Sequence, residues 1–247
     1  MPKQHAKTVA SESRFMDITE LRPVVCGSLA RLGSANDGGY VVPLVAVQEA
    51  DALLTFGLNH NWSFERDFKK LNDRAIIHCY DHTVSILWMD YLRFFRANNV
   101  HFRQRIWRDR EYGSVTIDDA FGRLPNQHQK VFLKMDVEGS EYRVLDDLLK
   151  HSAKITAMTI EFHEIDLLPE QFCSFIRKIK RHFYIAHIHG NNNAALSSQF
   201  GFPIVVELTF LNKRFLSAAP LPSTSSYPIP ELDRPNHPGR LDYTFVF

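Results

Sequence analysis

Apolar, β-branched segments alternate with amphipathic segments along most of the chain. Short apolar runs predict strands at residues 52–56, 75–80, 101–107, 131–135, 155–161, 182–187 and 204–211. Helical patterns lie between these runs, and this alternation is typical of a parallel sheet covered by helices. The pattern therefore predicts an α/β fold with a doubly wound, mostly parallel seven-stranded sheet.

The helices between the strands show an apolar stripe on one face. In residues 84–97 apolar side chains recur at i, i+3, i+4, i+7, i+8 and i+11, and residues 169–181 carry a similar stripe behind a proline suited to a first helical turn. Thr116 stands three residues before Asp119, which is the spacing of a capping box. A further helix is predicted over residues 141–150, after the fourth strand.

The two ends of the chain differ from the core at residues 46–215. Residues 1–45 predict an added cap, with a helix over 18–31 and a turn at 36–39 that leads into a strand at 40–42. Six of the 12 prolines fall within residues 216–247, so an extended arm is expected there. We expect cap, core and arm to form one domain over residues 1–247.

Charge and cysteine content exclude several classes of protein. Lys+Arg 29 against Asp+Glu 28 leaves a formal charge of +1, so no basic field is available for nucleic acid. The three cysteines are widely spaced, which argues against a disulfide framework and a zinc site. No signal-peptide pattern and no run of about 18 apolar residues is present. We therefore expect a cytoplasmic protein without stable membrane insertion, whose oligomeric state the sequence leaves open.

Polar residues follow five of the predicted strands. They are found at residues 57–61, 81–82, 136–139, 161–163 and 187–193. In an open parallel sheet, ligands bind beyond the carboxyl ends of the strands, where helix N-termini and irregular backbone converge. The agreement among five strand ends predicts a ligand site at this edge of the sheet.

The first two of these strand ends suggest an adenosine cofactor. Asp81 comes one strand–helix–strand step after Gly57, where a carboxylate can accept the ribose hydroxyls, although a capping or loop acid is an equal alternative. The segment FGLNHNWSFE is not GxGxxG, and the TyrxxxLys pair of short-chain dehydrogenases is absent. The aminoacyl end of S-adenosylmethionine carries no phosphate, so it tolerates a loop with one glycine and side-chain amides.

The segment KMDVEGSEYRVLDDLL at residues 134–149 resembles the FkbM-type methyltransferases, whose hallmark is a strand running into Asp-Val-Glu-Gly-x-Glu. Similar segments follow in the same order from about residue 31 to 212, namely RLGSANDGGYVVP, LLTFGLNHNWSFERDF, HCYDHT, IEFHEID and HIHGNN. The resemblance implies a class I, Rossmann-like methyltransferase that uses S-adenosylmethionine. It also implies transfer to oxygen, often on a sugar, so the expected partner is a small-molecule or glycan acceptor.

The resemblance places cofactor residues at the strand ends. Gly57 and Asn59 would line the methionine end, Asp81 the ribose, and Asp136 the reaction centre beside the transferable methyl group. His82, next to Asp81, is grouped with them. From the residues alone, Asp136 is more readily interpreted as a capping acid for the helix at 141–150, whereas the resemblance favours the functional role.

The remaining candidates concern the acceptor. Asp136 is the predicted base, with His163, His189 and Glu138 as further catalytic candidates, and the substrate-binding candidates are Asn191, Asn192 and Tyr40. Each of these residue types has a structural alternative, since histidines often pack, asparagines form turns, and acids favour helix N-termini. A divalent metal requirement stays open. The alternative function is a non-catalytic or dehydrogenase-like nucleotide-binding module.

Overall fold

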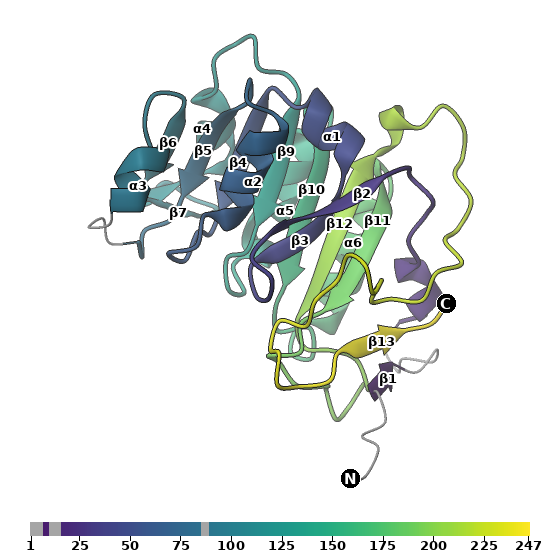
Figure 1. The fold of residues 1–247 in the computed structure, drawn as a ribbon. Helices are drawn as coiled ribbons and strands as arrows, with labels where there is room; N and C mark the ends of the chain where they lie inside the picture. The colour runs from purple at the N-terminus through teal and green to yellow at the C-terminus, as the bar shows by residue number, and fades with distance from the viewer. Residues whose placement is uncertain (1–6, 10–15, 85–88) are drawn as a thin grey trace.

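The computed structural model describes residues 7–9, 16–84 and 89–247, and its centre is a seven-stranded sheet (Figure 1). The strand order is β11-β12-β10-β9-β4-β5-β6, and all neighbours are parallel except at β12, which is antiparallel to β10 and β11. The strands are β4 (Ala52–Phe56), β5 (Ile76–Tyr80), β6 (Asn99–Phe102), β9 (Val131–Met135), β10 (Ile155–Phe162), β11 (Phe183–Gly190) and β12 (Val206–Asn212). The predicted α/β sheet is confirmed.

The strand order reverses between β4 and β9. From β4 the chain moves outward to β5 and β6, then returns to β9 and continues outward to β10. Phe56 pairs with Met135, so the loops that begin at Gly57 and Asp136 leave the sheet side by side. Such a topological switch point is where ligands bind in open α/β sheets.

Helices cover both faces of the sheet, and each layer has its own apolar core. One core packs beneath α1 (Leu44–Glu49), α2 (Ser63–Leu71) and α3 (Met89–Phe94). The other packs beneath α4 (Ile117–Gly122), α5 (Glu141–Lys150) and α6 (Pro169–Ile179). Thr116 and Asp119 form the predicted capping box at the start of α4. Both faces of β4, β5, β9 and β10 are buried, as expected of a sheet between two helical layers.

The strand predicted over residues 101–107 is present with different bounds, as β6 (Asn99–Phe102). Strand β6 ends at Phe102, whose partner Tyr80 is the last residue of β5, so no edge remains for further pairing. The chain then leaves the sheet, and β7 (Arg105–Ile106) pairs with β8 (Ser114–Val115). Of the helix predicted at 84–97, residues 89–94 form α3, residues 84 and 95–97 are not helical, and residues 85–88 lie outside the described residues. Leu92, expected on its apolar face, is 56% exposed.

The helix predicted at residues 18–31 was wrong. The chain forms one short 3-10 helix, η1 (Ile18–Leu21), and then becomes extended because Pro23 disfavours helical backbone at Arg22. Strand β2 (Leu29–Gly33) follows and forms an antiparallel hairpin with β3 (Gly39–Pro43), as the predicted turn at 36–39 requires. The hairpin lies across β10, β11 and β12 (Figure 1). Tyr40 of β3 thereby reaches Asp136 and Glu161 at the carboxyl edge of the sheet.

The C-terminal arm follows η2 (Lys213–Phe215) and forms no helix or strand before its last residues. It ends in β13 (Tyr243–Phe245), which pairs in parallel with β1 (Lys7–Val9) at the other end of the chain (Figure 1). On the way the arm passes the end of β11, where Asn192 donates to the backbone oxygen of His237. Among the described residues, no helix has the length and apolar character needed to cross a membrane.

Candidate active site

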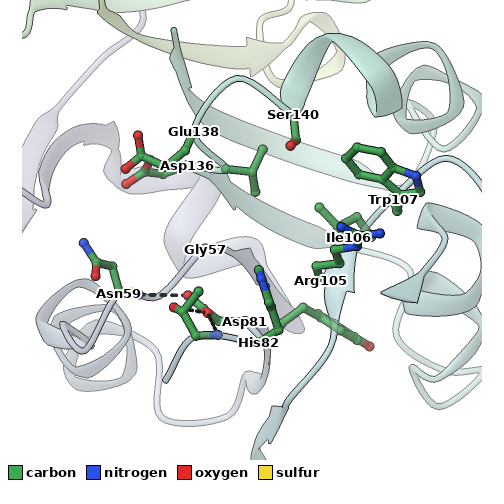
Figure 2. Close-up of a pocket in the computed structure, with 13 residues that line it drawn as sticks. Gly57, Asn59, Asp81, His82, Arg105, Ile106, Trp107, Asp136, Glu138 and Ser140 are labelled. Atoms are coloured by element: carbon green, nitrogen blue, oxygen red, sulfur yellow. Dashed lines mark hydrogen bonds between the residues drawn. The ribbon is translucent and has the colours of Figure 1, made fainter. Parts of the chain in front are cut away.

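A cavity of about 370 Å³ opens at the switch point, a volume in the range of small-molecule sites. Figure 2 shows Asn59 and Asp81 at one side of it, the Asp136 and Glu138 carboxylates at a second, and the segment from Arg105 to Trp107 at a third. The lining residues come from the ends of β4, β5 and β9 and from β7, namely Gly57, Asn59, Tyr80, Asp81, His82, Thr83, Arg105, Ile106, Trp107, Asp136, Val137, Glu138 and Ser140.

Gly57 allows the first two loops to pass each other closely. Its φ is +85°, a region that favours glycine, and a Cβ built on it would lie 1.6 Å from the backbone oxygen of Asp136. The buried Lys134 ammonium donates to the backbone oxygen of Gly57 at 3.1 Å and thereby holds the start of this loop. A side chain at position 57 would push the two loops apart, so glycine is required by the shape of the site.

Asp81 holds the loop that follows β4 in place. Its Oδ2 accepts hydrogen bonds from the backbone N–H groups of Leu58 at 2.7 Å and Asn59 at 2.9 Å, while Oδ1 accepts from the backbone N–H and hydroxyl of Thr83, each at 2.6 Å. Burial by itself would raise the pKa of Asp81, but these hydrogen bonds lower it to about 2. A carboxylate has about four lone-pair sites, so this one is fully engaged by the chain's own donors.

The wall formed by β7 and the residue after it is aromatic and cationic. The Arg105 guanidinium lies 4.6 Å from the centre of the Trp107 ring, and the Arg143 guanidinium lies 4.7 Å from it. Such cation–π contacts hold an aromatic ring in one orientation. Together with Ile106 they give the cavity a flat, partly apolar side opposite its acidic one.

Asp136 lines the acidic side, and a buried tyrosine orients it. The Tyr40 hydroxyl lies 3.2 Å from Asp136 Oδ2 and 3.0 Å from Glu161 Oε2. Burial and these two carboxylates raise the pKa of Tyr40 well above its usual value, so the hydroxyl keeps its proton. Asp136 does not cap α5, whose N-cap residue is Ser140. Its carboxylate is therefore available to the cavity.

His163, at the end of β10, is held by a buried acid. Glu141 Oε1 accepts the backbone N–H of His163 at 2.6 Å and lies 3.2 Å from its Nδ1, while Glu141 Oε2 accepts the N–H of Gly139. Burial would lower the pKa of His163, but the Glu141 hydrogen bond and nearby acids raise it to about 9. The imidazole is thus shifted away from the near-neutral pKa expected from sequence.

A second layer of polar groups supports Glu161, which is itself buried. Asn191 donates to Glu161 Oε1 at 2.7 Å, and Asn236 of the C-terminal arm donates to Glu207 at 2.7 Å and to Asp37 at 3.0 Å. Burial, with the negative charges of Asp136 and Glu207, raises the pKa of Glu161 well above its usual value. The carboxyl edge of the sheet therefore carries a concentration of acids that extends inward from the cavity.

His189 and Asn192 form hydrogen bonds with the C-terminal arm. His189 is 2% exposed, with Nδ1 3.3 Å from Glu207 and Nε2 3.0 Å from Asp242. Burial would lower the pKa of His189, but these hydrogen bonds and the surrounding acids raise it to about 10. Asn192 donates to backbone oxygens at residues 237 and 240 and accepts the N–H of His237. Both side chains are committed to contacts away from the cavity.

The structure brings most of the predicted site residues together. Those that line the cavity are Gly57, Asn59, Asp81, His82, Asp136 and Glu138, with Tyr40 and His163 directly behind Asp136. Asn191 reaches the site only through Glu161. Sequence reasoning missed Glu161, although it stands two residues before His163 and therefore projects from the same side of an extended strand. It also missed Trp107, because that residue was assigned to a strand.

Comparison with known proteins identifies the family. A model described as the methyltransferase FkbM domain matches residues 46–189, which is more than half of the chain. No curated protein sequence matches significantly. Similar solved structures include the fibrillarin pre-rRNA processing protein of Methanococcus jannaschii (9% identity, TM-score 0.41, covering 68% of this chain and 69% of that one). The precorrin-6y C5,15-methyltransferase of Geobacter metallireducens GS-15 is another (13%, 0.39, 69% and 85%).

The strand order with a single antiparallel strand at β12, the cavity at the β4–β9 switch point and the family match agree with one another. The match also decides against the dehydrogenase-like alternative. The chain belongs to the FkbM methyltransferase family, and it is an S-adenosylmethionine-dependent methyltransferase with the class I α/β fold.

Proposed function

We propose that this protein transfers the methyl group of S-adenosylmethionine to a hydroxyl oxygen of a saccharide. The observation that carries this proposal is the cavity in which the Gly57 loop and Asp81 face the Asp136 carboxylate (Figure 2). An adenosine-type cofactor and an acceptor can meet there, and Asp136 lies where the two would join.

The lining of the cavity fits the cofactor. Ile106 and Trp107 offer a flat apolar surface to the adenine, and Asn59 offers an amide to the methionine end. We assign the ribose to Asp81 and His82. Because the acceptor sites of Asp81 are engaged, a ribose hydroxyl must replace the Thr83 hydroxyl, whose side chain also lines the cavity. Asp136 and Glu138 place negative charge where the sulfonium and ammonium groups need it.

Asp136 is the residue that we assign to the acceptor proton. When bound, S-adenosylmethionine supplies an electrophilic methyl carbon on a sulfonium. Tyr40 donates toward Asp136 Oδ2 and leaves Oδ1 to accept a hydrogen bond from the acceptor hydroxyl. Asp136 would take the hydroxyl proton as the oxygen–carbon bond forms, and the electron pair of the broken carbon–sulfur bond would remain on sulfur. Fixed positions of both partners supply the in-line geometry.

Several features support a saccharide as acceptor. The side chains of Asn59, His82 and Glu138 are exposed at the cavity and can hydrogen-bond to several hydroxyls at once. The resemblance to FkbM-type enzymes also favours sugars of polysaccharides or natural products. Asn191 is assigned to the acceptor only indirectly, because its amide positions Glu161.

Mass spectrometry of acceptors tests this function. The protein is incubated with S-adenosylmethionine and a panel of oligosaccharides, glycosylated metabolites, amines and peptides. We expect a mass increase of one methyl group on a saccharide hydroxyl, and formation of S-adenosylhomocysteine in equal amount. Methylation confined to nitrogen or to peptides would contradict the saccharide assignment. Tighter binding of NAD(H) than of S-adenosylmethionine in calorimetry would contradict the cofactor assignment.

A further inference from the structure

The ring of His163 faces three carboxylates without a close hydrogen bond to any of them. Its Nε2 lies 3.4 Å from Glu138 Oε2, 3.8 Å from Glu161 Oε1 and 3.9 Å from Asp136 Oδ1. These distances exceed the usual 2.7–3.2 Å of an N–H···O hydrogen bond. Two atoms that each lie about 2.1 Å from one shared ion are separated by about 3.0 to 4.2 Å, depending on the angle at the ion.

The opposite side of the ring is fixed in the way that metal-binding histidines are fixed. Nδ1 faces the fully buried carboxylate of Glu141 at 3.2 Å, which directs the Nε2 atom toward Asp136 and Glu161. A histidine that binds a metal ion characteristically donates its other ring N–H to such a carboxylate. Glu141 is not one of the three acids that face Nε2. Its contact with Nδ1 leaves Nε2 as the ring nitrogen that could bind an ion together with those acids.

The carboxylates are held as well. Tyr40 contacts both Asp136 Oδ2 and Glu161 Oε2, and Asn191 donates to Glu161 Oε1. Asp136 Oδ1, Glu161 and His163 Nε2 thus belong to one preformed group whose ligand atoms lie within 4.8 Å of one another. Binding groups that are prepositioned in this way lose little conformational entropy when an ion binds.

Among the described residues, His163 is the only basic side chain that is paired with the acids of this group. In the part of the chain that the structure describes, no lysine or arginine forms an ion pair with Asp136, Glu138, Glu141 or Glu161. Buried carboxylates that face one another are costly unless a cation or a proton compensates them. A divalent cation held by His163 Nε2 and two of these acids would supply that compensation in place of a proton on His163.

We propose that Asp136, Glu161 and His163 bind one divalent cation of the Mn²⁺ type, which accepts both carboxylate oxygen and imidazole nitrogen. The ion lies on the acidic side of the cavity, where open coordination positions face the acceptor. There it would take the acceptor hydroxyl as a ligand and make its proton easier to remove. Asp136 Oδ1 has two lone pairs, so it can bind the ion with one and accept the hydroxyl proton with the other. This role rests on the proposed function, whereas the binding of the ion does not.

Titration of the metal-stripped full-length protein with Mn²⁺ tests the site, with free Mn²⁺ followed by electron paramagnetic resonance. We expect one tightly bound ion per chain, and an affinity at least 10-fold weaker in His163→Ala and in Glu161→Gln. His128→Ala at a half-buried position and Glu49→Gln at an exposed one change the same residue types outside the site, and both should bind as the unmodified protein does. Unchanged affinity in the folded site variants would overturn the proposal.

A second measurement needs no variant of the site. Electron spin echo modulation of the bound Mn²⁺ should show a directly coordinated nitrogen, because His163 is one of the ligands. Its absence would overturn the assignment, as would loss of the ion only in Glu207→Gln, which alters the neighbouring group of Asp37, Glu161 and Glu207. Binding of S-adenosylmethionine in the presence of a chelator is measured separately. That binding tests the methyltransferase cofactor site and is expected to survive removal of the metal.

Discussion

Asp136 and Asp81 lie on opposite sides of one cavity and hold their carboxylates in different ways. Asp81 is enclosed by four donors of its own chain, so its charge stabilises the loop that carries Gly57 and Asn59. Asp136 accepts from Tyr40 at one oxygen and faces the cavity with the other. An aspartate therefore anchors a loop at the end of β5, whereas at the end of β9 an aspartate is accessible to act as a base.

At Asp136, we predict that replacement by asparagine lowers turnover by about 10²- to 10⁴-fold, the usual contribution of a general base. Asparagine keeps the size of the side chain but cannot accept the proton, so the affinity for S-adenosylmethionine should change little. Single-turnover kinetics and calorimetry on the same preparation measure the two effects. Asp146→Asn, an exposed change on α5, is the matched control. Near-normal turnover of Asp136→Asn would assign the base to another group.

At Asp81, we predict that replacement by asparagine weakens binding of S-adenosylmethionine by about 1–3 kcal/mol, because a charge-assisted hydrogen bond to the ribose is lost. Thr83→Val should not weaken binding, since it removes the hydroxyl that competes with the ribose for Oδ1. Calorimetry at fixed pH measures both, and the exposed Asp73→Asn serves as control. If Asp81→Asn binds normally while Thr83→Val does not, the ribose contacts Thr83.

At the scale of elements, the site depends on how closely the loop after β4 approaches the loop after β9. The chain is extended up to Phe56 and Met135, and the next residues pass within contact distance only because position 57 has no side chain. The DVEG turn is similarly tight, with Glu138 at φ +52° and Gly139 at φ +89°. Backbone in this region costs free energy for a residue other than glycine, so Glu138 is held there by the surrounding turn.

We predict that Gly57→Ala lowers the free energy of unfolding by about 1–3 kcal/mol and abolishes cofactor binding. A Cβ at this position would meet the Asp136 oxygen, so both loops would have to shift. Gly122→Ala is the control, because Gly122 is helical and has open space at its Cβ; its unfolding free energy should be unchanged or slightly higher. Urea unfolding and calorimetry give the two quantities. A Gly57→Ala protein that binds the cofactor normally would show that the loops are free to separate.

At the scale of the whole molecule, the C-terminal arm closes over the end of β11. His187 lies 3.0 Å from Asp233, and His189 lies 3.0 Å from Asp242, so two strand histidines each meet an acid of the arm. Asn236 of the same arm contacts Asp37 and Glu207, which joins the arm to the acidic layer behind the cavity. The arm is thus part of the support of the site.

These contacts predict a pH dependence of stability. The pKa of His189 is raised to about 10 in the folded protein, against about 6.5 in an unfolded chain, so folding favours the protonated form. Its contribution is complete below about pH 6.5 and is lost as the pH rises through 10. We expect the free energy of unfolding, measured with urea, to fall across this window. The fall should be less steep in His189→Gln and in Asp242→Asn; equal slopes in all three proteins would contradict the prediction.

Local pattern was sufficient to determine most elements of the core and the edge of the sheet that carries the site. The strands at 52–56 and 131–135 and the helix at 141–150 were predicted to the residue, because apolar periodicity reports burial directly. The polar strand ends that contain Gly57, Asp81 and Asp136 were found for the same reason. Where local pattern and tertiary pairing disagree, as at residues 101–107 and 18–31, pairing decided the outcome.

The tertiary structure alone decided which polar groups contact one another and in which direction their pKa values shift. Tyr40 comes from the hairpin, Asp136 from the end of β9, and Glu161 and His163 from the end of β10. Only the crossing of the hairpin over β10 and the pairing of β9 with β10 bring these three segments together. The roles of His163 and His189 likewise follow from the acids that surround them. Sequence determined the residue types at the strand ends because those follow from each segment's own pattern. Their contacts and pKa values depend on neighbours that are distant in the chain.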